Sequence, residues 1–169
     1  MSASTSATSI VNFKEGIILT REFDAPRELV WKAWTDAELL KRWWGPIPFT
    51  SPSAQIDLRV GGKYVFCMRS PEGQDFWVCG VYREITPYDR IVFTDSFADE
   101  HGNIVPASHY SMTGDFPLEL LVTVTFEDLG SDKTRQTLRH EGVPEGEVRE
   151  MTAAGWSTSF DKLAEGLTA

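Results

Sequence analysis

The sequence contains few cysteines and no long apolar run. Its 169 residues include only two cysteines, Cys67 and Cys79, unlike the disulfide-dense pattern of small secreted folds. We interpret both as small buried thiols in a reduced protein, although a bond between neighbouring strands stays geometrically open. The longest apolar run, residues 118–126, spans nine residues and includes Glu119, whereas a membrane-spanning helix needs about 20. Residues 1–9 lack the basic and apolar stretches of a secretory signal, so we expect a cytoplasmic protein without a membrane partner.

Positive charge is also scarce. The chain has 16 Lys and Arg against 25 Asp and Glu, which gives a net charge of −9 and a pI near 4.8. Binding to nucleic acids depends on Lys and Arg that neutralise phosphates, and anionic membrane surfaces attract the same residues. The charge balance therefore argues against nucleic acid and against an anionic membrane as partners.

Motifs that carry metal or catalytic chemistry are missing. HExxH, CxxC and HxH do not occur, and neither does the GxSxG of a nucleophile elbow. The Gly61-Gly62-Lys63 segment is too short for a phosphate-binding loop and is read as a turn. We therefore predict no metal, no cofactor and no assigned catalytic residue.

Two titratable residues are still candidates for acid–base chemistry. His140 shares the inward parity of Leu138 on an expected strand, where it could hydrogen-bond a ligand or its own loop. Asp95 lies in mid-strand with the parity of Phe93 and Phe97, and on a buried face it would be a carboxylate that needs a partner. The sequence alone does not bring the two together, so whether the protein is an enzyme stays open.

Aromatic residues, by contrast, are abundant. Six Trp, ten Phe and four Tyr make up 12% of the chain, and side chains of this size must line a core or a pocket. The length predicts one domain, which we place at residues 11–169 after a flexible tail of residues 1–10.

Hydrophobic periodicity predicts an α+β fold. One strand at 13–23 is followed by a short helix from Pro26 and a second short helix capped by Thr35 or Asp36. Strands are then expected in alternating segments bounded by turns, and a long C-terminal helix in a segment of helical period; these segments are 54–59, 63–69, 76–85, 90–97, 118–126, 134–140 and the helix 144–167. The tight turns indicate a single antiparallel sheet of about six to seven strands.

One face of such a sheet has to be buried, and only the C-terminal helix is long enough to cover it. A curved sheet that grips one helix can enclose an apolar pocket, or its side chains can form a solid core. The candidate lining residues come from the strand faces and from one side of the helix, and include Ile56, Leu58, Tyr64, Phe66, Met68, Leu120, Val122, Val124, Met151, Gly155, Ser159 and Phe160.

A series of motifs follows in order along the chain: Arg21 to Pro26, Val30-Trp31, Ala33 to Asp36, Arg42 to Pro46, Asp57 with Arg59 to Gly62, Gly80 to Pro87, Arg90 to Thr94, Thr134 to His140, and Gly155-Trp156 with Phe160 and Leu163. This ordered series resembles the activator of heat-shock-protein ATPase homologue family, of the START-like or SRPBCC superfamily. The resemblance implies a helix-grip fold with an apolar cavity between sheet and last helix. It does not imply one function, because fold analogy alone cannot select one.

Three functions are compatible with this resemblance. The first is binding of a small apolar or amphipathic molecule, the second is an enzyme of the polyketide cyclase or hydrolase kind, and the third is a co-chaperone that stimulates the heat-shock ATPase. We rank the binding protein first, and unpaired edge strands leave a homodimer open. Its expected ligand-binding residues are Tyr64, Phe66, Met68, Trp77, Leu120, Val122, His140, Met151, Gly155, Ser159 and Phe160.

Overall fold

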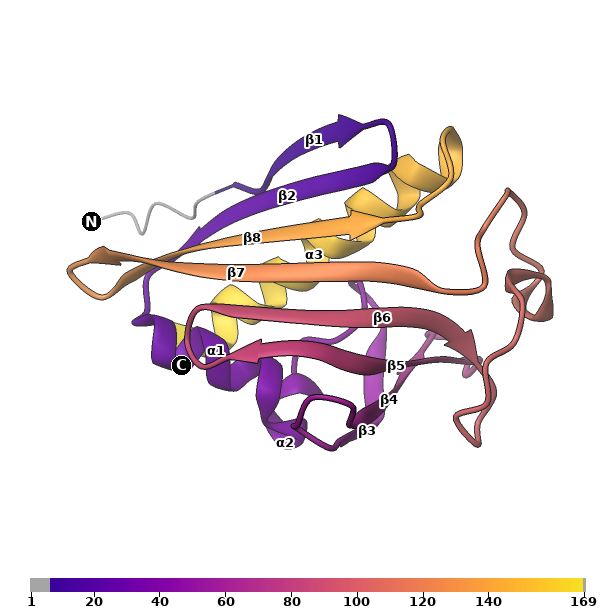
Figure 1. Ribbon diagram of the computed structural model, residues 1–169, viewed down its shortest axis with the longest axis horizontal. Coiled ribbons are helices and arrows are strands. Elements are labelled where there is room, and N and C mark those ends of the chain that lie inside the picture. Colours follow the sequence, from indigo (N-terminus) through magenta and orange to yellow (C-terminus); the bar gives the residue numbers. More distant parts are fainter. Residues whose placement is uncertain (1–6, 169) are drawn as a thin grey trace.

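A computed structural model describes residues 7–168, which form an α+β fold with one antiparallel sheet of eight strands. Figure 1 shows this sheet in front of the long C-terminal helix α3. The strands are β1 (Ser9–Phe13), β2 (Gly16–Phe23), β3 (Thr50–Ile56), β4 (Lys63–Arg69), β5 (Asp75–Thr86), β6 (Arg90–Ala98), β7 (Leu120–Gly130) and β8 (Lys133–Glu141). The helices are α1 (Arg27–Thr35), α2 (Ala37–Leu40), the single 3-10 turn η1 (Ala107–Tyr110) and α3 (Glu147–Thr168).

The N-terminal segment differs from the expectation of one strand at 13–23. The chain turns at Lys14 and Glu15, so that β1 and β2 form an antiparallel hairpin. This hairpin raises the strand count to eight. Most of the expected tail lies outside the described residues, whereas Ser9 and Ile10 pair in β1 with Thr20 and Leu19.

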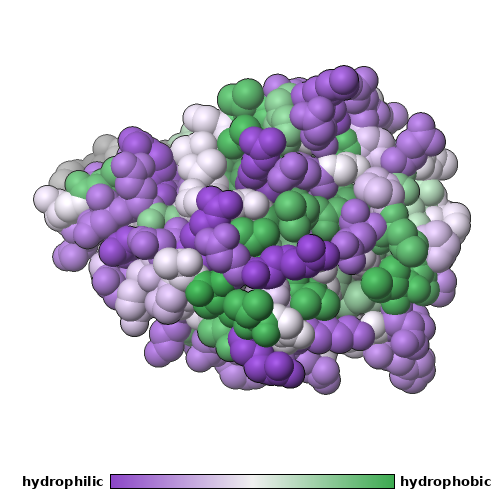
Figure 2. All heavy atoms as spheres, viewed as in Figure 1, coloured by the Kyte–Doolittle hydropathy of each residue, from purple (hydrophilic) through white to green (hydrophobic). Residues whose placement is uncertain are grey.

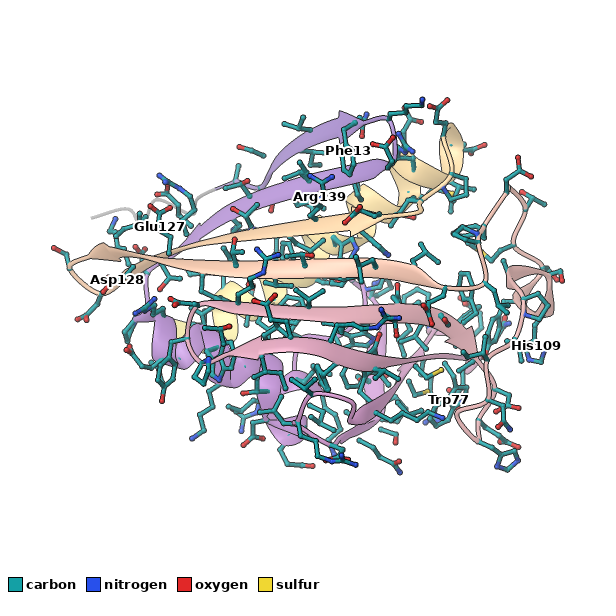
Figure 3. The ribbon with its side chains drawn as sticks, in the orientation of Figure 1. Phe13, Trp77, His109, Glu127, Asp128 and Arg139 are labelled. Carbon is teal, nitrogen blue, oxygen red and sulfur yellow. The ribbon has the colours of Figure 1, made fainter. Side chains whose placement is uncertain are left out.

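The order of strands in the sheet is β1-β2-β8-β7-β6-β5-β4-β3. We call the face that α3 covers the inner face, and the opposite face the outer face. Figure 2 shows the outer face, where hydrophilic side chains are interspersed with apolar patches. One outer contact is the guanidinium of Arg139 over the ring of Phe13, 4.3 Å from its centroid (Figure 3).

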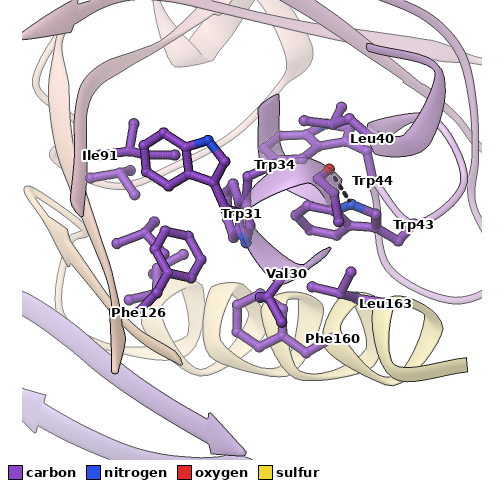
Figure 4. Close-up of a cluster of buried hydrophobic side chains, with 14 of the residues drawn as sticks. Val30, Trp31, Trp34, Leu40, Trp43, Trp44, Ile91, Phe126, Phe160 and Leu163 are labelled. Atoms are coloured by element: carbon purple, nitrogen blue, oxygen red, sulfur yellow. Dashed lines mark hydrogen bonds between the residues drawn. The ribbon is translucent and has the colours of Figure 1, made fainter. Parts of the chain in front are cut away.

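A dense aromatic core fills the inner face at the end that α1 and α2 cover (Figure 4). The rings of Trp34 and Trp43 meet at 4.7 Å in an edge-to-face arrangement, and Trp43 lies 6.3 Å from Phe160 of α3. The indole nitrogens also have partners, because Trp43 Nε1 donates to the Ala33 carbonyl at 3.0 Å and Trp34 Nε1 donates to Gln136 Oε1 at 2.7 Å. This end of the molecule is therefore closed by packed side chains.

Side-chain hydrogen bonds stabilise the start of α2 and anchor the start of α3. Asp36 caps α2 by accepting hydrogen bonds from the backbone N–H groups of Glu38 and Leu39. Helix α3 begins at Glu147, three residues later than expected. Its buried Arg149 donates to the carbonyl oxygens of Val143 and Phe13, and thus ties the helix to the N-terminal hairpin.

Both cysteines lie on the outer side of β4 and β5, where they are buried and unpaired. Burial raises the pKa of the Cys67 thiol to about 11 and also raises that of Cys79. A raised pKa lowers the thiolate fraction at neutral pH, so both are structural residues rather than nucleophiles.

Candidate functional site

A cavity of about 270 Å³ lies between the first half of α3 and the inner face of the sheet. It is at the end of the strands opposite the aromatic core, where β6 and β8 end and β7 begins. Three larger depressions, of about 630, 620 and 340 Å³, lie on the described surface and have several charged side chains in their walls. The smaller, mostly apolar cavity is the better candidate for a ligand site.

The wall of the cavity comes from five parts of the fold: the segment after α2, the ends of the strands, the segment before β7, the connection from β8 to α3, and α3 itself. Its charged or titratable side chains are Asp95 and His140, and no Lys or Arg occurs among the described residues that line it. The lining residues are Trp44, Gly45, Pro46, Met68, Val78, Asp95, Ser96, Phe97, Met112, Phe116, Leu120, His140, Val143, Val148, Met151, Thr152, Gly155, Trp156 and Ser159.

The residues expected to bind a ligand separate into three groups. Six of them line the cavity: Met68, Leu120, His140, Met151, Gly155 and Ser159. Four others are buried in the adjoining core and do not line it: Tyr64, Phe66, Val122 and Phe160. Asp95, the second acid–base candidate, lines the cavity beside His140.

Trp77 is the residue that the structure places elsewhere. Side chains alternate along a strand, and its neighbour Val78 lines the cavity, so Trp77 points to the outer side of the sheet (Figure 3). There its backbone N–H donates to the hydroxyl of Tyr110 at 3.1 Å. The backbone at Trp77 therefore holds the segment before β7, and the Trp77 side chain does not line the cavity.

His140, Asp95 and Trp156 form a polar cluster in the cavity wall. Trp156 Nε1 donates to His140 Nδ1 at 3.1 Å, which requires Nδ1 to be unprotonated. The ring proton of neutral His140 is then on Nε2, which lies 3.0 Å from Asp95 Oδ2. The His140 side chain is 6% exposed and that of Asp95 is 19% exposed. Although the two atoms are close, Nε2–H is out of line for a hydrogen bond and has no other acceptor.

Tyr64 lies behind this cluster. Its hydroxyl donates to the Thr94 carbonyl at 2.7 Å. Burial, followed by the nearby Asp95 carboxylate, raises the pKa of Tyr64 well above its usual value of 10.0. Tyr64 therefore stays protonated at neutral pH and serves as a structural donor.

Sequence reasoning missed lining residues in two segments. Trp44, Gly45 and Pro46 are not among the expected ligand-binding residues, yet they form one wall of the cavity. Met112 and Phe116 come from the segment between β6 and β7, which is longer than a hairpin needs. Its unusual length was a signal that this segment covers something.

Two findings concern metal sites and membrane-spanning helices. Within residues 7–168, no three His, Cys, Asp or Glu side chains are grouped so that they could hold a metal ion. Among the same residues, no helix is both long enough and apolar enough to cross a membrane.

The sequence profile of the Activator of Hsp90 ATPase homolog 1-like proteins matches residues 24–168. The chain belongs to this family. Its fold agrees with solved structures of helix-grip type, and no curated protein matches the sequence.

Three of these solved structures are similar over nearly their whole length. A crystal structure from Nitrosomonas europaea is 27% identical, covers 94% of this chain and 97% of its own, and has a TM-score of 0.72. One from Chromobacterium violaceum is also 27% identical, with coverages of 93% and 99% and a TM-score of 0.73. A solution structure from Arthrobacter aurescens is 28% identical, with coverages of 95% and 91% and a TM-score of 0.73. Family membership thus supports ligand binding or a related function in general, and the cavity has to carry any finer assignment.

Proposed function

We propose that this member of the Activator of Hsp90 ATPase homolog 1-like family binds a small apolar or amphipathic molecule between its sheet and helix α3. The observation that carries the proposal is the cavity of about 270 Å³ with a mostly apolar wall and one polar cluster. Apolar walls that contact water are unfavourable, and a ligand that replaces this water gains the hydrophobic free energy. Such walls with a few placed polar groups are typical of small-molecule sites.

The composition of α3 supports a binding role over simple packing. Towards its C-terminus the helix presents Phe160 and Leu163 to the aromatic core, whereas the part that lines the cavity has Gly155 and Ser159 beside the larger Met151 and Trp156. Large side chains in place of Gly155 and Ser159 would fill the space. The small ones leave room for a molecule that is not part of the chain.

One observation favours a second function, an enzyme that acts on the molecule bound in the same cavity. His140 and Asp95 approach to 3.0 Å in the cavity wall, as an acid–base pair would. If the protein is such an enzyme, His140→Ala and Asp95→Asn will each abolish turnover of a substrate that binds. Unchanged rates in both variants would exclude this pair as catalytic.

The third hypothesis, stimulation of the heat-shock ATPase, is supported by the family name and stays a prediction. It is tested by adding the purified protein to the chaperone and measuring ATP hydrolysis. No stimulation would remove it.

The binding proposal is tested by a probe and by a variant that fills the cavity. Native mass spectrometry of the purified protein should show a co-purifying apolar molecule, and the neutral dye N-phenyl-1-naphthylamine should gain fluorescence on binding. Gly155→Leu should lower the affinity for the dye by roughly tenfold or more, because the new side chain occupies cavity volume. A Cβ at Gly155 has room, since its nearest neighbour is Pro46 at 3.8 Å.

Gly166→Leu is the matched control on the same helix, away from this cavity. Both substitutions raise helix propensity by about 0.8 kcal/mol, so neither should unfold α3. Equal affinity of both variants for the dye, or no dye binding by the unsubstituted protein, would contradict the proposal.

A further inference from the structure

We propose that the ligand carries a hydroxyl group, as an alcohol or phenol does, and that Asp95 and His140 bind this hydroxyl. The inference rests on the proposed function and specifies the chemistry of its ligand. It starts from Asp95 and His140, which lie close to each other in the cavity wall and are incompletely paired.

The charge of the wall excludes an acidic head group. Asp95 contributes an acceptor-only carboxylate, and the described lining residues include no Lys or Arg that could neutralise a second anion. A ligand carboxylate or phosphate at this point would face Asp95 in a desolvated site, where like charges repel strongly. Fatty acids and other anionic amphiphiles are therefore disfavoured.

The hydrogen-bonding groups of the wall favour a ligand atom that both donates and accepts. The contact with Trp156 occupies His140 Nδ1 and leaves the ring proton on Nε2, which has no aligned acceptor. Beside it, Asp95 Oδ2 can accept. A hydroxyl oxygen can accept from Nε2–H and donate its own proton to Asp95 at the same time.

A ligand ammonium satisfies only half of this arrangement. It can donate to Asp95 but has no lone pair for His140 Nε2–H, which would stay buried without an acceptor. An ammonium gains a charge-assisted bond to Asp95 but leaves Nε2–H as it is in the free protein. Of the three head groups, only a hydroxyl pairs with both Asp95 and His140.

The test compares three molecules with the same ten-carbon chain and different heads: 1-decanol, decanoate and decylammonium. Each displaces N-phenyl-1-naphthylamine from the protein at pH 7.5, and the displacement gives its affinity. We expect decanol to bind more tightly than either charged analogue by roughly tenfold or more. If decanoate or decylammonium binds best, or if decanol fails to displace the bound dye, the hydroxyl inference is wrong while the proposed cavity function stands. Absence of dye binding contradicts the proposed function itself.

Two variants test whether Asp95 determines the order of affinities of the three molecules. Asp95→Asn removes the negative charge, so decanoate should gain affinity relative to decanol. Glu150→Gln makes the same change of charge on the exposed surface of α3 and should leave the ranking unchanged. An unchanged ranking in a folded Asp95→Asn variant would overturn the role of Asp95. The ranking in the unsubstituted protein decides the hydroxyl inference by itself, even if this variant does not fold.

Discussion

The two ends of the inner face have the same sheet behind them and the same helix in front, yet one is packed and the other is hollow. At the packed end, Trp34 of α1 and Trp43, from the segment after α2, lie between the sheet and Phe160. At the hollow end the described residues place no α-helix between the sheet and α3, and the segment before β7 contributes Met112 and Phe116 to the wall. The difference separates a closely packed part of one core from the part that holds the cavity.

The comparison also explains why aromatic content alone is ambiguous. Trp43 and Trp44 are neighbours in the sequence, but Trp43 is 2% exposed in the packed end whereas Trp44 lines the cavity. Its ring lies 5.5 Å from that of Trp156, which also lines the cavity. The boundary between the packed end and the hollow end thus passes between Trp43 and Trp44.

The largest expected effect comes from emptying the packed end. Trp43→Ala removes a fully buried indole and its hydrogen bond to the Ala33 carbonyl, and large-to-small changes of this kind cost about 3–5 kcal/mol. We expect a loss of this size in the free energy of unfolding, measured by urea denaturation. Trp77→Ala is the control, because Trp77 is only half-buried and lies on the outer side. Equal losses in the two variants would contradict the assignment of stability to the packed end.

The second prediction concerns alkaline pH and two tyrosines near the boundary. Burial raises the pKa of Tyr64 and of Tyr82 above 10 in the folded state. The folded protein therefore holds these protons more tightly than the unfolded chain does. Their stabilising contribution is complete below about pH 10 and is lost as the pH rises further, at about 1.4 kcal/mol for each unit by which a pKa is raised. The Cys67 thiol, with its pKa of about 11, adds a loss that begins near pH 9.

The measurement is the free energy of unfolding between pH 8 and pH 11. The unsubstituted protein should lose stability steeply above pH 10, and Tyr64→Phe should show a shallower loss because it has one fewer buried group to ionise. Parallel curves for the two proteins would show that ionisation of Tyr64 does not contribute to the loss of stability at alkaline pH.

The strands were predicted correctly where polar and apolar residues alternate, because the apolar side then identifies the buried face of the strand. Strand β8, for example, places Leu138 and His140 inward as its pattern indicates. The pattern was less informative at Phe76, Trp77 and Val78, where three successive apolar residues leave no polar side to define the face. The turn at Lys14 and Glu15 was missed because apolar residues continue on both sides of it.

The candidate site was predicted only in part, for a related reason. Parity placed Asp95 and His140 inward, but their approach depends on the strand order β8-β7-β6, which local periodicity does not contain. The tautomer of His140 depends on Trp156, from a helix 16 residues later in the chain. Irregular segments have no period at all, so Met112 and Phe116 gave no signal beyond the length of their loop.

The smallest expected effect on stability comes from the hollow end. Phe116 is half-buried in the segment before β7, and its ring meets that of Phe97 at 5.3 Å. Phe116→Ala removes a loop side chain whose neighbours can relax, so we expect a loss of only about 0.5–1 kcal/mol in the free energy of unfolding. The same ring lines the cavity, so under the binding proposal the release rate of N-phenyl-1-naphthylamine, measured by stopped-flow fluorescence, should rise several-fold. A loss of stability as large as that of Trp43→Ala would instead show that Phe116 is part of a continuous packed core, and the contrast between the two ends would no longer hold.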